Sequence, residues 1–148
     1  MNRISNAPHA HVIDPDWRQD PVPWAQDGDA TMAPRIHAAC LDQCGECLAA
    51  LAEEAADSTA TTAVLMAVGF SLTLMMSPAL LVKVREELAF APPLQAMIDR
   101  VHAVGEQVRA SEALAMTRDL ERPERRDVVE GCIQLIGLYA MVMQTKEP

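Results

Sequence analysis

Apolar residues recur at spacings of three and four along most of the chain, which is the pattern of amphipathic α-helices. Between Pro34 and Asp57 the apolar stripe is narrow: apolar and cysteine side chains fall within roughly 60° of Cys44 on a helical wheel, opposite several acids. Prolines near the predicted starts of four helices suit a first helical turn. The predicted helices cover residues 34–57, 59–76, 78–91, 93–118 and 123–145, with Ser77 as the cap of the third.

Two stretches of these predicted helices are almost entirely apolar. Residues 59–76 carry aliphatic side chains on all sides, and residues 131–143 have Gln134 as their only strongly polar residue. A helix without a polar face belongs in the interior of a protein. A single small domain does not normally bury two such helices completely. We therefore expect a homodimer whose interface covers the apolar surface that one chain leaves exposed.

The N-terminal segment, residues 1–33, has a different character. Four prolines block regular helix in its first 23 residues, and five aspartates keep the segment solvated. We interpret residues 1–33 as an extended arm. Both tryptophans, Trp17 and Trp24, lie in it, and our hypothesis is that they anchor the arm to the bundle or to a neighbouring subunit.

The composition favours helices over sheets. Apolar residues make up 50% of the 148 residues and aromatic residues only 3%, so the core must be aliphatic, whereas β-sandwiches depend on aromatic and β-branched residues. The length suits one domain. We therefore predict an all-α fold: a single-domain helical bundle of about five helices over residues 34–147, preceded by the extended N-terminal arm.

The formal net charge of −9 limits the partners that this chain is expected to have. An acidic surface repels nucleic acid and anionic membranes, so we expect neither as a partner. Residues 58–82 lack charged side chains, but their Thr, Ser and Ala content and the Ser77-Pro78 break argue against a membrane span. Because the N-terminus has no apolar signal segment, we predict a cytoplasmic protein with reduced cysteines.

The predicted helix 34–57 carries the most unusual chemistry. Cys40, Cys44 and Cys47 are three or four residues apart, so neighbouring thiols face each other if the helix is continuous. His37 lies one turn before Cys40, and Cys132 is expected to complete a site across the bundle. Thiolates select Cu(I), and mixed sulfur and nitrogen ligands select Zn, so these five residues are candidate ligands for Cu(I) or Zn.

The residues from Cys40 to Cys47 follow the motif Cys-x3-Cys-x2-Cys. This segment resembles the helices of the bacterial copper storage proteins, four-helix bundles that repeat the motif towards their interior. The resemblance covers only these eight residues and implies Cu(I) bound by inward-facing thiols. Copper storage proteins carry cysteines on all helices, whereas here the only other one is Cys132, so the resemblance implies one or two ions and no bulk storage.

The motif Cys44-Gly45-Glu46-Cys47 also fits a redox dithiol. All-helical peroxidases of the AhpD-like family combine Cys-x2-Cys with a glutamate three residues before it and a histidine four residues after it. Leu41 and Leu51 occupy those positions here. The proton relay that would activate a thiol is therefore missing from the motif, unless the fold brings a histidine such as His37 close to it.

Two other groups are weaker candidates for metal binding. His9 and His11 in the arm are expected to bind a metal only loosely, because they lie in an irregular segment. Asp99, His102 and Glu106 have the spacing of a carboxylate–histidine site, but the other predicted helices offer no matching acids in their cores.

Three functions are consistent with these patterns. The leading hypothesis is a non-enzymatic, dimeric helical-bundle module for binding or interaction, which binds a soft metal ion through its cysteine-lined helix. The first alternative is a small thiol oxidoreductase that uses Cys44 and Cys47. The second is a module that binds a partner protein or an apolar small molecule, in which the cysteines serve only as small buried side chains.

Overall fold

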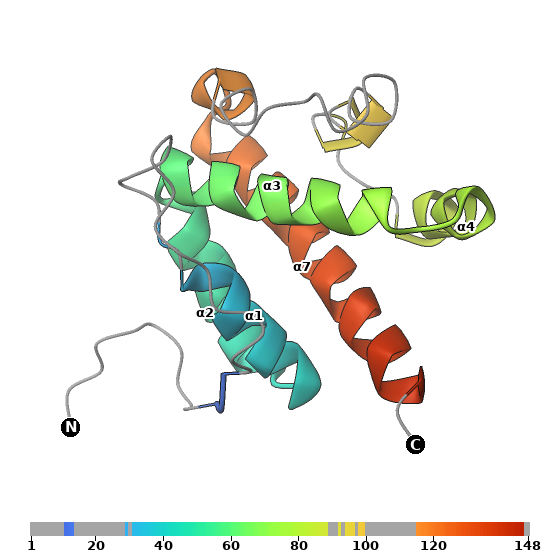
Figure 1. Ribbon diagram of the computed structural model, residues 1–148. Coiled ribbons are helices and arrows are strands. Elements are labelled where there is room, and N and C mark those ends of the chain that lie inside the picture. Colours follow the sequence, from blue (N-terminus) through green and yellow to red (C-terminus); the bar gives the residue numbers. More distant parts are fainter. Residues whose placement is uncertain are drawn as a thin grey trace.

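The computed structural model describes residues 11–13, 29, 31–88, 92, 94–96, 98–99 and 115–146. The fold is all-helical, as predicted. The described helices are α1 (Met32–Leu41), α2 (Gly45–Ala56), α3 (Thr59–Leu74), α4 (Pro78–Leu88) and α7 (Arg122–Lys146). In Figure 1, α1 lies beside α2, and α3 runs across α7.

The predicted continuous helix over residues 34–57 is wrong, because the chain reverses direction after α1. The guanidinium of Arg35, near the start of α1, pairs with the Glu54 carboxylate, near the end of α2, at an N–O distance of 2.6 Å. The two helices are therefore antiparallel and form a helical hairpin whose turn is residues 42–44. The three cysteines of the motif gather around this turn and do not form one straight stripe.

The turn has the hydrogen bonds of a Schellman motif. The backbone N–H of Gln43 donates to the carbonyl of Cys40 at 3.1 Å, and that of Cys44 donates to the carbonyl of Ala39 at 3.0 Å. Gln43 has a φ of 53°, in the left-handed region that usually favours glycine. The break was invisible in the sequence because a glutamine occupies this position.

Helices α3 and α7 form the centre of the molecule, and α3 confirms the apolar central helix predicted at 59–76. Ser58 caps α3, since its Oγ accepts a hydrogen bond from the Thr61 N–H at 3.1 Å. A Cβ at Gly69 would lie 3.4 Å from Leu135 and 3.5 Å from the Cys132 sulfur, so the glycine allows close approach of α3 to α7. The largest fully buried side chains are Met32, Ile36, Leu51, Leu65, Met66, Leu94, Ile98, Leu135, Ile136, Val128 and Val129.

Arginines at the start of α7 fasten it to the end of α2. Arg122 pairs with Glu53 at 2.9 Å and with Asp57 at 2.7 Å, and the Arg125 Nε donates to the Ala56 carbonyl at 2.9 Å. Cations at the C-terminus of α2 also complement its dipole. Because α7 starts at the end of α2, it runs back towards the turn of the hairpin.

Helix α4 extends from the end of α3 (Figure 1). Ser77 caps it, with its Oγ accepting from the Leu80 N–H at 3.2 Å, and Pro78 is its first residue, as predicted. Large apolar side chains are exposed where α3 passes into α4. They are Leu74 at 39%, Met75 at 69% and Val82 at 57% relative exposure.

Some sequence-based predictions fall outside the described residues. These are the anchoring by Trp17 and Trp24, most of the predicted helix 93–118, and the candidate ligands His102 and Glu106. Asp99 is described, and its carboxylate pairs with Arg85 at 2.8 Å. It therefore serves as a partner of α4.

No single helix among the described residues has the length and apolar character needed to cross a membrane. Helices α2 and α3 reach that length and apolar character only when they are taken together, and the chain bends by 119° between them.

Candidate metal centre

The hairpin turn brings together three groups that bind metals. One nitrogen of the His11 imidazole and the sulfurs of Cys44 and Cys47 all lie within 4.8 Å of one another. Within this group, the His11 Nε2 lies 3.2 Å from the Cys47 Sγ. Residues from the arm and from the hairpin therefore meet in one His/Cys/Cys cluster.

A carboxylate orients the histidine of this cluster. The Nδ1 atom of His11 lies 2.6 Å from an oxygen of Asp42, which is the C-cap residue of α1. The bond to this carboxylate raises the pKa of His11 above its ordinary value. When the Nδ1–H donates to Asp42, the Nε2 lone pair faces the two sulfurs.

The two thiols of the cluster occupy the start of α2. Cys44 is the N-cap residue and Cys47 lies in the first turn, which places both sulfurs on one side of the helix start. The unpaired backbone N–H groups and the dipole at a helix N-terminus favour negative charge, as thiolate ligands require. The Cys47 side chain is fully buried, whereas Cys44 is half-buried.

The size of the cluster fits a metal of zinc dimensions. With Zn–S bonds of about 2.3 Å and Zn–N bonds of about 2.0 Å, the donors around a tetrahedral ion lie about 3.5 to 3.8 Å apart. The donors here lie within 4.8 Å of one another, and one pair lies at 3.2 Å. Shifts of about an ångström in the side chains bring all three into bonding distance.

The other predicted ligands do not belong to this cluster. The sulfur of Cys40 lies 3.6 Å from the position of a Cβ at Gly137, and burial raises its pKa to about 11. Cys132 is fully buried between α3 and α7, and burial raises its pKa to about 12. His37 is buried in α1 with 5% relative exposure. Of the five candidates, the structure brings Cys44 and Cys47 together.

His11 is a stronger candidate ligand than its position in an irregular segment indicates, and Asp42 is a partner that the sequence pattern does not reveal. A histidine near an acidic turn has no local spacing that reveals the contact, because 31 residues separate His11 from Asp42. Only the Cys-x2-Cys motif pointed to this place.

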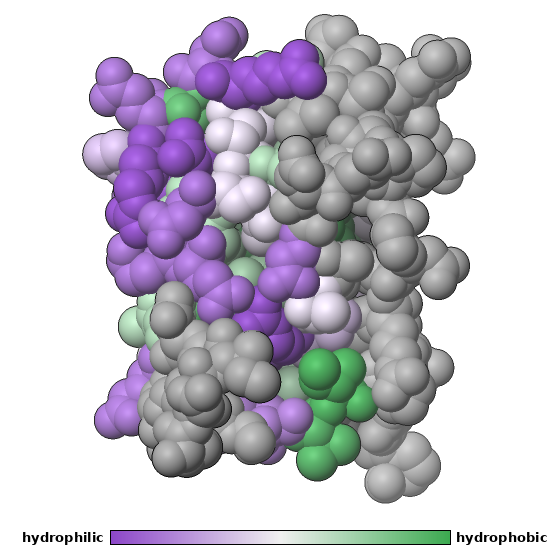
Figure 2. Space-filling view, turned by 90° about the vertical axis from the view of Figure 1, so that its left-hand side faces the viewer, coloured by the Kyte–Doolittle hydropathy of each residue, from purple (hydrophilic) through white to green (hydrophobic). Residues whose placement is uncertain are grey.

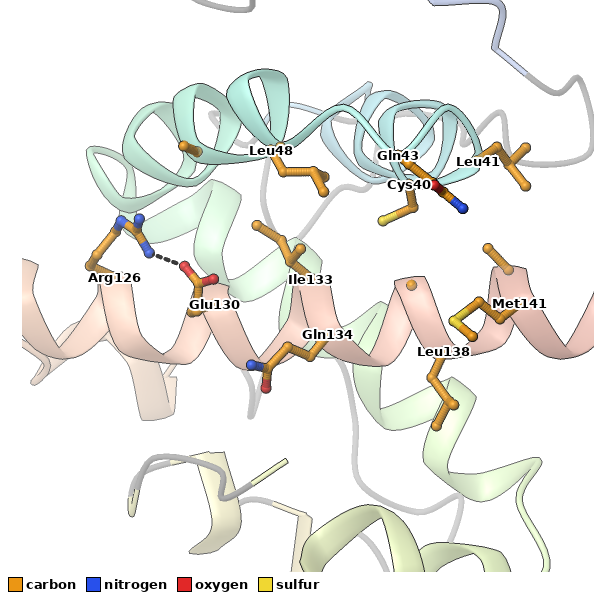
Figure 3. Close-up of a pocket in the computed structure, with 14 residues that line it drawn as sticks. Cys40, Leu41, Gln43, Leu48, Arg126, Glu130, Ile133, Gln134, Leu138 and Met141 are labelled. Carbon is orange, nitrogen blue, oxygen red and sulfur yellow. Dashed lines mark hydrogen bonds and ion pairs between the residues drawn. The ribbon is translucent and has the colours of Figure 1, made fainter. Parts of the chain in front are cut away.

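A separate apolar cavity of about 660 Å³ lies between the hairpin and α7. Figure 3 shows Cys40 and Leu48 pointing from the hairpin towards α7, and Ile133 pointing back at them. The ion pair of Arg126 with Glu130 lies at one end of the cavity. The thiols of Cys44 and Cys47 do not line this cavity, so the cavity and the metal cluster are distinct.

The side of the molecule on which α1 and α2 lie is mostly hydrophilic among the residues coloured in Figure 2, with a small apolar patch.

Comparisons of the chain with protein-family models, with curated proteins and with solved structures found no match.

Proposed function

We propose that this protein binds one thiophilic metal ion, Zn²⁺ or Cu⁺, through the His11 Nε2 and the thiolates of Cys44 and Cys47. The observation that carries the proposal is the convergence of one imidazole and two thiols within 4.8 Å, from segments far apart in the sequence. Nitrogen and sulfur donors of this kind select these ions over Mg²⁺ and Ca²⁺, which prefer oxygen.

The carboxylate behind the histidine supports the same function. Histidines that bind metals almost always donate their second N–H to a carboxylate, a carbonyl or water, which fixes the ring and raises its basicity as a ligand. The contact of 2.6 Å between His11 and Asp42 has this arrangement. Packing of the histidine alone would not need a charged partner on the outer nitrogen.

Titration of the reduced, metal-free protein tests the proposal. We expect one Zn²⁺ per chain in competition with a chromophoric chelator, and loss of at least about 100-fold in affinity in the Cys44→Ser and Cys47→Ser variants, because each removes a direct ligand. Cys132→Ala is the matched control and should keep the affinity. Equal affinity in all four proteins would overturn the proposal.

The same titration with Cu⁺ under anaerobic conditions identifies the preferred ion. Cu⁺ accepts two or three soft donors, whereas Zn²⁺ takes four donors and adds water or another group to three protein ligands. Retention of Cu⁺ against a strong Cu⁺ chelator, with ready loss of Zn²⁺, would assign the site to copper. The reverse result would assign it to zinc.

A second candidate function is a redox dithiol. The half-buried Cys44 at the start of α2 and the fully buried Cys47 one turn later form the pair of attacking and resolving thiols that dithiol enzymes use, and His11 supplies the histidine that the motif lacks. Peroxide oxidises the pair to a disulfide in two steps. The Cys44 thiolate attacks one peroxide oxygen, which breaks the O–O bond, releases one water and leaves a sulfenic acid, and the Cys47 thiol then forms the S–S bond and displaces the sulfenic hydroxyl as a second water. Rapid peroxide consumption by the metal-free protein that is absent in Cys44→Ser would support this function.

The apolar cavity gives a specific reason to retain the binding of an apolar small molecule as a third candidate. Its volume of about 660 Å³ lies within the range of about 300–1,000 Å³ that is usual for small-ligand sites. Native mass spectrometry of the purified protein tests this candidate. A co-purified mass that disappears in a Gly137→Leu variant would support it.

We also propose that the chain forms a homodimer in the cytoplasm, with the exposed apolar residues Leu74, Met75 and Val82 in the interface. Burial of such residues favours association. Sedimentation equilibrium at micromolar concentration should give twice the chain mass of 16.1 kDa, and a Met75→Glu, Val82→Glu variant should give the monomer mass.

A further inference from the structure

The candidate metal centre joins two parts of the chain that are remote in sequence. His11 comes from the N-terminal segment, and 36 residues separate it from Cys47. His11 contacts the hairpin through Asp42 and Cys47, among other groups. Val12, the next residue, is 90% exposed.

Without a metal, this attachment is weak. The Asp42 side chain is 57% exposed, although that of His11 is only 13% exposed, and ion pairs with a solvent-exposed partner contribute about 0–1 kcal/mol and are screened by salt. A thiol accepts hydrogen bonds weakly. The contacts of His11 alone therefore do not hold the segment firmly.

A metal ion changes this balance because it bonds to both parts of the chain at once. Every ion bound by His11, Cys44 and Cys47 requires residue 11 to be at the hairpin turn, so attachment of the segment strengthens metal binding and metal binding strengthens attachment equally. This reciprocity follows from the position of the ligands and not from the identity of the ion.

We propose that metal binding clips residues 11–13 onto the turn of the α1–α2 hairpin, and that release of the metal frees them. The proposal rests on the proposed metal-binding function. Occupancy by a soft metal ion then controls whether residues 11–13 stay attached to the turn of the hairpin.

Backbone ¹⁵N relaxation of Val12 and Ile13 tests the clip. In 0.3 M NaCl, we expect order parameters below about 0.6 for the metal-free protein and near 0.85, the value of a rigid backbone, with one Zn²⁺ bound. In His11→Ala at saturating Zn²⁺, both order parameters should stay low. His102→Ala is the control and should behave like the unaltered protein.

The metal content of each sample is measured by mass spectrometry. It distinguishes failure of the clip from failure of the proposed metal-binding function. One bound Zn²⁺ with unchanged order parameters at Val12 and Ile13 would overturn the clip and leave metal binding intact. High order parameters without metal would also overturn it. Absence of bound Zn²⁺ and Cu⁺ would overturn both the clip and the proposed function.

Discussion

The imidazole of His11 reaches across 31 residues of sequence to place its Nδ1 atom 2.6 Å from the Asp42 carboxylate, at the turn between α1 and α2. This contact directs the other imidazole nitrogen, Nε2, towards the thiol of Cys47 at 3.2 Å. The arrangement has the order of groups found in metal sites, in which a carboxylate holds a histidine and the histidine holds the ion.

Replacing Asp42 with Asn should weaken metal binding without removing a ligand. The variant loses the charged acceptor behind His11, and loss of such a partner typically reduces affinity 10–100-fold. Competitive titration with Zn²⁺ measures the change. Asp57→Asn removes an equally exposed charge at the other end of α2 and should bind Zn²⁺ as the unaltered protein does. Equal affinities of the Asp42 and Asp57 variants would contradict the role of Asp42.

Replacing Gln43 with Gly should stabilise the fold. Gln43 has a φ of 53°, and left-handed backbone costs a residue with a side chain roughly 1–2 kcal/mol, which the greater freedom of glycine in the unfolded chain partly offsets. We expect a gain of about 0.5–1 kcal/mol in the free energy of unfolding by urea. Gln43→Ala retains the cost of the left-handed backbone, so we expect no gain in its free energy of unfolding. A loss of stability in Gln43→Gly would contradict the left-handed turn.

Buried Cys132 should make the fold sensitive to alkaline pH. Burial raises its pKa to about 12, above the ordinary value of 9.0, so the folded thiol keeps its proton after the unfolded thiol has lost it. The contribution of the protonated Cys132 thiol to the free energy of unfolding is complete below about pH 9 and is lost as the pH rises towards 12. Relative to Cys132→Ala, the unaltered protein should lose up to about 1.4 kcal/mol more per pH unit in this window. Parallel stability curves for the two proteins would show that Cys132 is not buried.

Enlarging Gly69 tests the crossing of α3 and α7. A Cβ at this position would lie in ordinary contact with Leu135 and Cys132, at 3.4 and 3.5 Å. Gly69→Ala should therefore be tolerated, with a change within about 1 kcal/mol, whereas Gly69→Leu should destabilise the fold by about 1–3 kcal/mol. Thermal unfolding followed by circular dichroism gives both values. Gly45→Leu, at a position with open space around it, is the control for the added side chain.

The helical fold was predictable because it follows from the spacing of apolar residues. The break at Ser77-Pro78 was an equally local feature, and α4 starts there with Ser77 as its cap. The hairpin turn was not predictable in this way. Its left-handed residue is Gln43, and the apolar stripe continues through the turn because both helices of the hairpin bury their cysteine-bearing sides.

The candidate metal centre was predictable in part. The sequence indicated thiols near Cys44 and Cys47, since their spacing is local. It indicated His11 only as a loose ligand beside His9 and did not indicate Asp42, because the contact of His11 with Asp42 depends on where residues 11–13 meet the hairpin. The prediction that Cys40 shares one helix face with them failed for a physical reason: the reversal at residues 42–44 turned a predicted linear stripe into a cluster around a turn.

X-ray absorption at the metal edge of the reconstituted protein tests the central claim most directly. For the zinc form, we expect two sulfur neighbours at about 2.3 Å and at least one imidazole nitrogen at about 2.0–2.1 Å, with the imidazole signal lost in His11→Ala. A first shell of oxygen and nitrogen alone, or an imidazole signal that persists without His11, would contradict a metal centre built from His11, Cys44 and Cys47.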